Sequence, residues 1–230
     1  MKPSGKREPD IKRLPAVRQA RWHLLVSLGF ATSFLALFAW LSEEVFEGDM
    51  QQFDSRIRSA VHGFSSPQMT KFMQALTLLG SIGVLFALFL ISTALLLIAG
   101  LKRAAIWLGV AAAGSLVLDI SLKLAFHRVR PVPFFGNLPL TYSFPSGHAL
   151  SSLCFYCTLA GLCCTGIHNR AACISIWAAS IMLVAGIGFS RIYLGVHYPT
   201  DVAAGYFAGT IWVIAVLFAA GIRRPVPNSA

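Results

Sequence analysis

The sequence has few charged residues. They make up 12% of its 230 residues, whereas soluble domains carry roughly 25%. Acids are the scarcer sign, with nine Asp and Glu against nineteen Lys and Arg, and there is neither an internal repeat nor a low-complexity tract. With 56% hydrophobic residues and a mean hydropathy of +0.68, the composition excludes an ordinary soluble domain and indicates an integral membrane protein.

Cysteine is also scarce, and all five residues fall between positions 154 and 173. The Cys154-x-x-Cys157 spacing is found in redox and metal sites, but no histidine of suitable spacing joins it. Packing of small side chains between helices is the favoured interpretation. A clear signal-peptide cleavage site is missing, and the first apolar run exceeds the roughly 7–15 residues of a signal peptide. This run is therefore expected to remain as a membrane span.

Six apolar runs are each near the ~20 residues needed to cross a bilayer core. Four are continuous, and two contain small and polar residues, with His148 at the start of one. The expected fold is all-α, a six-transmembrane-helix bundle over residues 22–221 with both termini on one side. The runs cover residues 22–42, 80–101, 104–122, 146–167, 171–190 and 201–221.

The net charge of +10 would suit a nucleic-acid partner, but its distribution argues against one. Basic residues precede the first span, join spans two and three and spans four and five, and follow the last. All of these fall on one side of a six-span protein, which the positive-inside rule assigns to the cytoplasm. Residues 1–21 and 222–230 are thus expected to be cytoplasmic tails, with the basic N-terminal tail contacting anionic lipid. No nucleic acid is expected.

Two longer connections, residues 43–79 and 124–145, are expected on the outer side. The first combines charged and apolar residues at helical spacing, which predicts an amphipathic helix resting in the outer interface. A lid and a lipid guide remain open as roles, and a plain connecting helix is favoured. The apolar residues are Phe53, Ile57, Ala60, Val61 and Phe64, and the charged ones are Asp54, Arg56 and Arg58.

Three clusters of chemically active residues lie at the outer ends of spans three to six. They are Lys123 to Arg130-Pro131, Pro145-Ser146-Gly147-His148, and Ser190-Arg191 followed by His197 and Asp201. Because these span ends face the same side, residues distant in sequence should meet at one rim of the bundle. The active site is expected at this rim.

The second cluster predicts an anion site at the start of a helix. Ser146 suits a helix cap, and Gly147 lets the backbone approach a ligand closely. The free N–H groups and the helix dipole at such a position attract an anion. His148 would lie beside it, with a pKa range suited to acid–base catalysis. Three cations near the membrane could bind phosphate, although snorkelling would explain any one alone: Lys123, Arg130 and Arg191.

His197 and Asp201 are four residues apart at the entry to a helix. A carboxylate bonded to one ring nitrogen fixes the tautomer and leaves the other nitrogen as a nucleophile. A helix-capping Asp would make the same contact but would not explain the nearby cations. Asp119 is expected to pair with the lysine one turn later, and a structural and a catalytic ion pair both stay open. Arg128 could be a phosphate ligand, but a loop or headgroup contact is favoured. The remaining histidines are given no role: His23, His62, His127 and His168.

Taken together, the three clusters resemble the signature of the type-2 phosphatidic acid phosphatase superfamily. That superfamily includes lipid phosphate phosphatases, bacterial undecaprenyl diphosphate phosphatases and the soluble vanadium haloperoxidases. The spacings that carry the resemblance are all present: Lys123-(six residues)-Arg130-Pro131, Pro145-Ser146-Gly147-His148 and Ser190-Arg191-(five residues)-His197-(three residues)-Asp201. The resemblance covers roughly residues 65–221.

The resemblance implies a metal-independent phosphatase without a cofactor. His197 would attack phosphorus and form a phosphohistidine, with Asp201 activating it. His148 would protonate the leaving oxygen and later help water to release phosphate. Carboxylates at the site are too few for a magnesium cage. The implied phosphate-binding residues are Lys123, Arg130, Ser146, Gly147 and Arg191.

The substrate stays open among undecaprenyl diphosphate, phosphatidic acid and phosphatidylglycerol phosphate. A lipid phosphotransferase using the same site is the first alternative, and a vanadium haloperoxidase is disfavoured because the resembling peroxidases are soluble. A non-catalytic lipid carrier or channel would leave His148 and the His197–Asp201 pair unexplained. The compact chain favours a bacterial inner-membrane enzyme whose site faces outward. The oligomeric state is not predicted.

Overall fold

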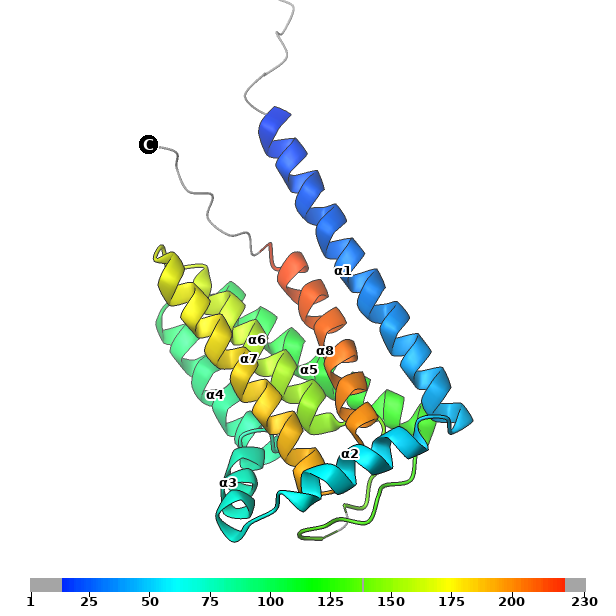
Figure 1. The fold of residues 1–230 in the computed structure, drawn as a ribbon. Coiled ribbons are helices and arrows are strands. Elements are labelled where there is room, and N and C mark those ends of the chain that lie inside the picture. The colour runs from blue at the N-terminus through cyan, green and yellow to red at the C-terminus, as the bar shows by residue number, and fades with distance from the viewer. Residues whose placement is uncertain (1–13, 138, 222–230) are drawn as a thin grey trace, which may run out of the picture.

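The computed structural model describes residues 14–137 and 139–221, and these form eight α-helices and no strand (Figure 1). The expected all-α class is confirmed. The helices are α1 (Leu14–Glu47), α2 (Gln51–Gly63), α3 (Pro67–Leu78), α4 (Ile82–Ile98), α5 (Lys102–Phe126), α6 (Gly147–Cys164), α7 (Arg170–Tyr193) and α8 (Pro199–Ala219).

Helix α6 lies at the centre of the bundle, in contact with α4, α5, α7 and α8, and it is the most buried of the candidate spans. Its many small residues allow neighbouring helices to approach closely. Cys154 and Cys157 belong to this core, and the Cys154 thiol contacts the carbonyl oxygen of Gly209 on α8 at 3.8 Å. The packing interpretation of this cysteine pair is therefore confirmed.

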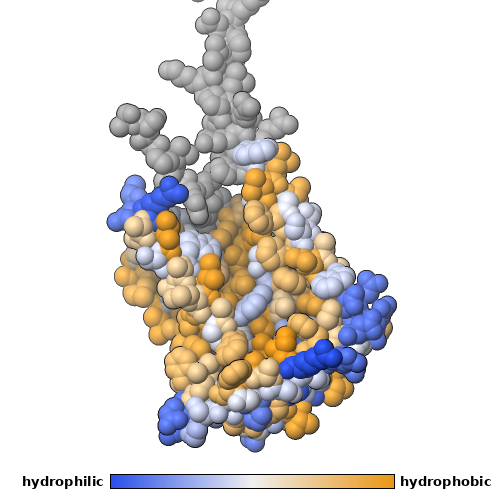
Figure 2. Space-filling model, viewed as in Figure 1, coloured by the Kyte–Doolittle hydropathy of each residue, from blue (hydrophilic) through white to orange (hydrophobic). Residues whose placement is uncertain are grey.

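The outer surface of the bundle is that of a membrane protein. Five helices of the described chain are long and apolar enough to cross a bilayer, namely α1, α5, α6, α7 and α8. Helices α3 and α4 meet at a bend of 48°, and they add a sixth candidate span if the pair is taken as one. Figure 2 shows hydrophobic residues over the flank and hydrophilic ones gathered towards the two ends. The apolar run expected over residues 80–101 contains α4, and α3 precedes it across the bend.

The path of the chain places the first residue of α1 and the last residue of α8 at the same end of the bundle (Figure 1). The α4–α5 and α6–α7 connections turn at that end, and they carry Lys102, Arg103 and Arg170. Of the two predicted tails, residues 1–13 and 222–230 lie outside the described residues.

Residues 43–79 complete α1 and then form two further helices. Helix α2 crosses the ends of α7 and α8 and contacts both (Figure 1). The helix predicted here is present. Asp54 is fully buried, whereas Phe53 and Phe64 are 51% and 83% exposed. Helix α3 begins with a Ser66 cap, whose Oγ accepts a hydrogen bond from the Met69 N–H at 3.2 Å, and it packs on α7.

Candidate active site

Four helix ends and two loops bring the three sequence clusters together at the end of the bundle that α2 covers (Figure 1). Helices α5 and α7 end here, and α6 and α8 begin here. The predicted residues are contributed in this order: Lys123 by α5, Arg130 by the α5–α6 loop, Ser146 as the cap of α6, Gly147 and His148 by its first turn, Arg191 by α7, His197 by the α7–α8 loop and Asp201 by α8.

The buried pair at the centre of the site is His197 with Asp201. The Nδ1 atom of His197 lies 3.3 Å from Oδ2 of Asp201, and the two residues are 1% and 0% exposed. Asp201 lies in the first turn of α8, where its Oδ2 also accepts the backbone N–H of Tyr198 at 2.9 Å and the hydroxyl of Ser143. Since Nδ1–H donates to the carboxylate, the lone pair of the His197 ring is on Nε2.

Burial is the main influence on the charge of His197. It lowers the pKa of this ring to about 4, with Arg130 and Arg191 adding to the shift and Asp201 opposing it. The imidazole is therefore neutral near pH 7. A neutral ring whose Nε2 carries a lone pair instead of a proton is the form in which a histidine acts as a nucleophile.

Arg130 lies directly against this nitrogen. Its Nη1 is 2.9 Å from Nε2 of His197 and donates to the carbonyl oxygen of Val196 at 2.9 Å. The other side of the guanidinium is held by Thr141, whose carbonyl oxygen accepts from Nε at 2.6 Å. Burial lowers the pKa of Arg130, and the charges of Asp201 and Asp119 oppose that shift. The guanidinium stays charged and can neutralise phosphoryl oxygens beside the nucleophile.

Lys123 brings a second cation to the start of α6. Its Nζ pairs with Asp119 one turn earlier, so the predicted contact between these two residues is confirmed. Gly147 passes close to the pair: a Cβ at this position would lie 2.8 Å from Oδ1 of Asp119 and 3.0 Å from Nζ of Lys123. A glycine is thus required for the lysine to reach the first turn of α6.

Two buried polar atoms beside this turn have no partner among the described residues. They are the Oγ of Ser146 and the Nε of Arg191. Ser146 caps α6 with extended backbone, yet its side chain accepts no hydrogen bond from the helix. Arg191 is anchored through Nη1, which donates to Thr77 of α3 at 2.7 Å. Buried polar groups are normally satisfied, so unpaired groups at a helix start are suited to an anion.

His148 is half-buried on the first turn of α6, where the charges of Arg191, Arg130 and Lys123 act on it. Its ring packs against the junction of α3 and α4. A Cβ at Gly80 in this junction would be 3.3 Å from Cδ2 of His148 and 2.4 Å from a methyl carbon of Ile187. The bent second span therefore forms one wall around the His148 ring.

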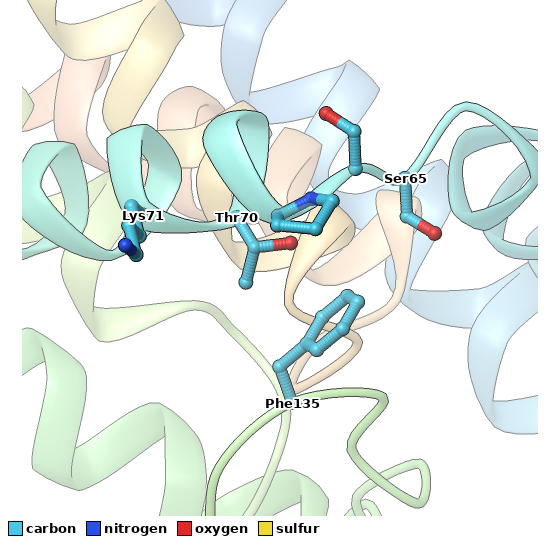
Figure 3. Close-up of a pocket in the computed structure, with 6 residues that line it drawn as sticks. Ser65, Thr70, Lys71 and Phe135 are labelled. Carbon is cyan, nitrogen blue, oxygen red and sulfur yellow. The ribbon is translucent and has the colours of Figure 1, made fainter.

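A shallow pocket of about 360 Å³ lies beside the cluster, between the first turn of α3 and the α5–α6 loop (Figure 3). It contains none of the predicted catalytic residues. Figure 3 shows the ring of Phe135 facing Thr70 of α3. The lining residues are Ser65, Ser66, Pro67, Thr70, Lys71 and Phe135.

The family of the chain follows from its last four helices. A sequence profile described as the PAP2 superfamily matches residues 104–224, which include every predicted site residue. The chain belongs to the PAP2 superfamily. The resemblance inferred from the three clusters is therefore confirmed, and the chain is an integral membrane protein of a phosphatase family.

Two known proteins and one solved structure show the extent of the similarity, which ranges from 38% to 85% of this chain. Phosphatidylglycerophosphatase B of Bacillus subtilis (strain 168) is 27% identical over 201 residues, covering 78% of this chain and 89% of that protein. An undecaprenyl-diphosphatase of Sulfolobus acidocaldarius is 32% identical over 90 residues, or 38% of each chain. The crystal structure of a transmembrane PAP2 type phosphatidylglycerolphosphate phosphatase from Bacillus subtilis superposes with a TM-score of 0.78 and 25% identity, covering 85% of this chain and 98% of that one.

One expectation about this PAP2 site is wrong, and one residue was missed. Arg128 was assigned to a loop or headgroup contact, but it forms ion pairs with Asp201 and with Asp54 of α2. Asp54 was not considered for the site. It shares one face of α2 with Ile57, Arg58 and Val61, at positions i, i+3, i+4 and i+7, and this phase was the signal available in the sequence.

Proposed function

We propose that the protein hydrolyses the terminal phosphate of a membrane lipid phosphate or diphosphate, through a phosphohistidine on His197. The observation that supports this most directly is the arrangement of the His197 ring. Asp201 lies 3.3 Å from Nδ1, and Arg130 lies 2.9 Å from Nε2. A nucleophile and a phosphoryl-stabilising cation therefore meet at one nitrogen.

The chemistry proceeds in two steps. The Nε2 lone pair of His197 attacks phosphorus, the bond from phosphorus to the leaving oxygen breaks, and protonated His148 gives that oxygen its proton. In the second step His148 accepts a proton from water as the water oxygen attacks phosphorus and the P–N bond breaks. Phosphate leaves and both rings return to their starting states. Three of the five proposed phosphate ligands, Lys123, Arg130 and Arg191, neutralise the transferring group, and the other two, Ser146 and Gly147, bind its oxygens by hydrogen bonds.

The substrate class is supported by the relatives and by the depth of the site. The B. subtilis relative that aligns over most of the chain is named for phosphatidylglycerol phosphate, and another PAP2 relative for undecaprenyl diphosphate. A phosphate at the helix ends would leave the acyl or prenyl chain beside apolar flanks. Phosphatidylglycerol phosphate is therefore the first lipid to test, with undecaprenyl diphosphate and phosphatidic acid beside it.

The proposed location is the bacterial inner membrane, with the site facing outward. Lys102, Arg103 and Arg170 lie at the end of the bundle opposite to the site. The positive-inside rule places that basic end in the cytoplasm.

The test is phosphate release by purified protein in detergent micelles from each of the three lipids. Wild type should release phosphate from at least one, and His197→Ala should lower kcat by about 10³-fold or more, because the nucleophile is lost. Radiolabelled phosphate should remain on wild type after a denaturing quench at alkaline pH, should be released by acid as expected for a P–N bond, and should be absent from the variant. His168→Ala is the matched control, because His168 is exposed on the α6–α7 connection.

Two results would overturn this assignment. Normal turnover by His197→Ala would exclude the phosphohistidine, and absence of phosphate release from all three lipids would exclude the substrate class. The same assay separates a phosphotransferase, because that enzyme would transfer the label to an added lipid or sugar acceptor instead of to water.

A further inference from the structure

Asp54 is a carboxylate with no exposed surface, on a helix that carries none of the three sequence clusters. Its Oδ2 accepts from Nη2 of Arg128 at 2.7 Å and from the hydroxyl of Thr200 at 2.7 Å. Its Oδ1 accepts the backbone N–H of Thr200 at 3.0 Å. A buried carboxylate is costly unless it is paired and hydrogen-bonded, and Asp54 is both. It therefore ties α2 to the start of α8.

Arg128 joins this carboxylate to the proposed catalytic one. While Nη2 binds Asp54, Nη1 donates to Oδ1 of Asp201 at 2.6 Å and to the hydroxyl of Thr200 at 2.8 Å. The guanidinium also lies 4.2 Å from the centre of the Tyr198 ring. The planar fork of an arginine can serve two carboxylates at once, which a lysine cannot. Both terminal nitrogens of Arg128 are thus occupied by protein oxygens.

We propose that Asp54 and Arg128 are positioning residues, which fix the orientation of the Asp201 carboxylate towards His197 without touching the substrate. The inference rests on the proposed function of the His197–Asp201 pair. Arg128 occupies Oδ1 of Asp201, so Oδ2 is the oxygen that faces Nδ1 of His197. Helix α2 thereby acts on the chemical step from outside residues 104–224, the part of the chain that matches the PAP2 profile.

The positions of the cations separate this role from phosphate binding. Arg130 reaches Nε2 of His197, the face on which phosphorus would be attacked, whereas Arg128 binds the carboxylate behind Nδ1. A residue on that far side alters how well the nucleophile is oriented but not how tightly the lipid phosphate binds. Its loss should therefore lower kcat and leave KM nearly unchanged.

Steady-state kinetics with the lipid that wild type hydrolyses tests the proposal. Arg128→Ala should lower kcat about 100-fold and Asp54→Asn about 10-fold, because a small misplacement of a catalytic group has effects of this size. KM should change by less than about threefold. The double variant should be no slower than Arg128→Ala, since the two residues act as one unit. Methylguanidinium should restore part of the activity of Arg128→Ala and none of that of His197→Ala.

Arg56→Ala is the matched control, because Arg56 is an exposed cation on the same helix, and it should behave as wild type. A second measurement needs no turnover. The downfield imidazole Nδ1–H proton resonance of His197, assigned by its loss in His197→Gln, should be present in wild type and shifted or lost in Arg128→Ala. Thermal unfolding of each variant in detergent reports whether it is folded, and Asp54→Asn, which keeps the size of the side chain, covers the case in which Arg128→Ala unfolds.

Several outcomes would overturn the positioning role. A raised KM at unchanged kcat would make Arg128 a phosphate ligand, and unchanged kinetics would give the pair no role in catalysis. Additive losses would show that Asp54 and Arg128 act separately. If wild type hydrolyses no lipid in the panel, the proposed function fails. The Nδ1–H resonance of His197 then tests the positioning role without turnover, and an unshifted signal in both Arg128→Ala and Asp54→Asn excludes that role.

Discussion

Gly147 illustrates how closely the cations approach the helix that is proposed to bind phosphate. Gly147 has no Cβ, and a Cβ at this position would lie 2.8 Å from Oδ1 of Asp119 and 3.0 Å from Nζ of Lys123. The substitution Gly147→Ala should therefore push Nζ of Lys123 away from the first turn of α6. We expect kcat/KM to fall about 10-fold or more, since a charge-assisted hydrogen bond contributes about 1.5–3 kcal/mol. Kinetics on the best lipid substrate and thermal unfolding in the same detergent measure the two effects.

The thermal unfolding temperature should change little, because alanine is the better helix former and the displaced groups are side-chain ends. Gly109→Ala on α5 is the control: a Cβ there would meet nothing within 4 Å, so activity should be unaffected. Equal activity of Gly147→Ala and wild type would mean that Lys123 is not needed near this turn.

The side chains that could be foreseen are those whose positions follow from helix ends. Lys123, His148, Arg191 and Asp201 lie where apolar runs start or stop, and runs of membrane length fix which ends share a side. Arg128 and Asp54 could not be paired in this way. Their contact depends on where α2 lies across α7 and α8, and that arrangement is set by packing between segments distant in sequence.

The helices also differ in how well the sequence predicts them. Hydropathy predicted α5 to α8 well, because each coincides with one apolar run of membrane length, although the runs of α6 and α7 also contain small and polar residues. The α3–α4 pair was harder, since α4 alone has 17 residues and α3 is less apolar. Local signals for both starts are present, with Ser66-Pro67 capping α3 and Ser81 capping α4. Across the 48° bend α3 packs on α7 and α4 packs on α5 and α6, and no local pattern encodes these contacts.

The α3–α4 junction should be sensitive to added volume. Gly80→Ala would place a methyl group 2.4 Å from Ile187 and 3.3 Å from His148, and the Tyr156 hydroxyl, which donates to the Leu79 carbonyl at 2.9 Å, limits retreat of the chain. We expect a loss of about 1–3 kcal/mol in unfolding free energy and a lower kcat, because both α7 and the His148 ring are displaced. Thermal unfolding and turnover in detergent measure these effects.

Gly83→Ala, three residues further along α4, is the matched variant, because its Cβ would meet nothing within 4 Å. It should unfold at the wild-type temperature or slightly above. If Gly80→Ala were as stable and as active as Gly83→Ala, the junction would have room to move, and its packing against His148 would not matter to the reaction.

The molecule as a whole is polarised between its two ends. One end carries the site, covered by α2, and the other carries the basic connections between α4 and α5 and between α6 and α7. Hydrophobic residues cover the flank between them (Figure 2). The protein can therefore take two orientations in a membrane, and the basic connections favour the orientation in which the site lies on the outer side. In that orientation the leaving phosphate is released on the outer side.

Cysteine labelling in intact cells tests this orientation. With all five native cysteines replaced by alanine, Ser65→Cys places a thiol in the pocket beside the site (Figure 3), and Gly166→Cys places one on the exposed α6–α7 connection. A membrane-impermeant maleimide should label Ser65→Cys in intact cells, whereas Gly166→Cys should react only after permeabilisation. The opposite pattern would place the site in the cytoplasm. The positive-inside rule would then fail for this chain, and its lipid substrate would have to be presented from the inner leaflet.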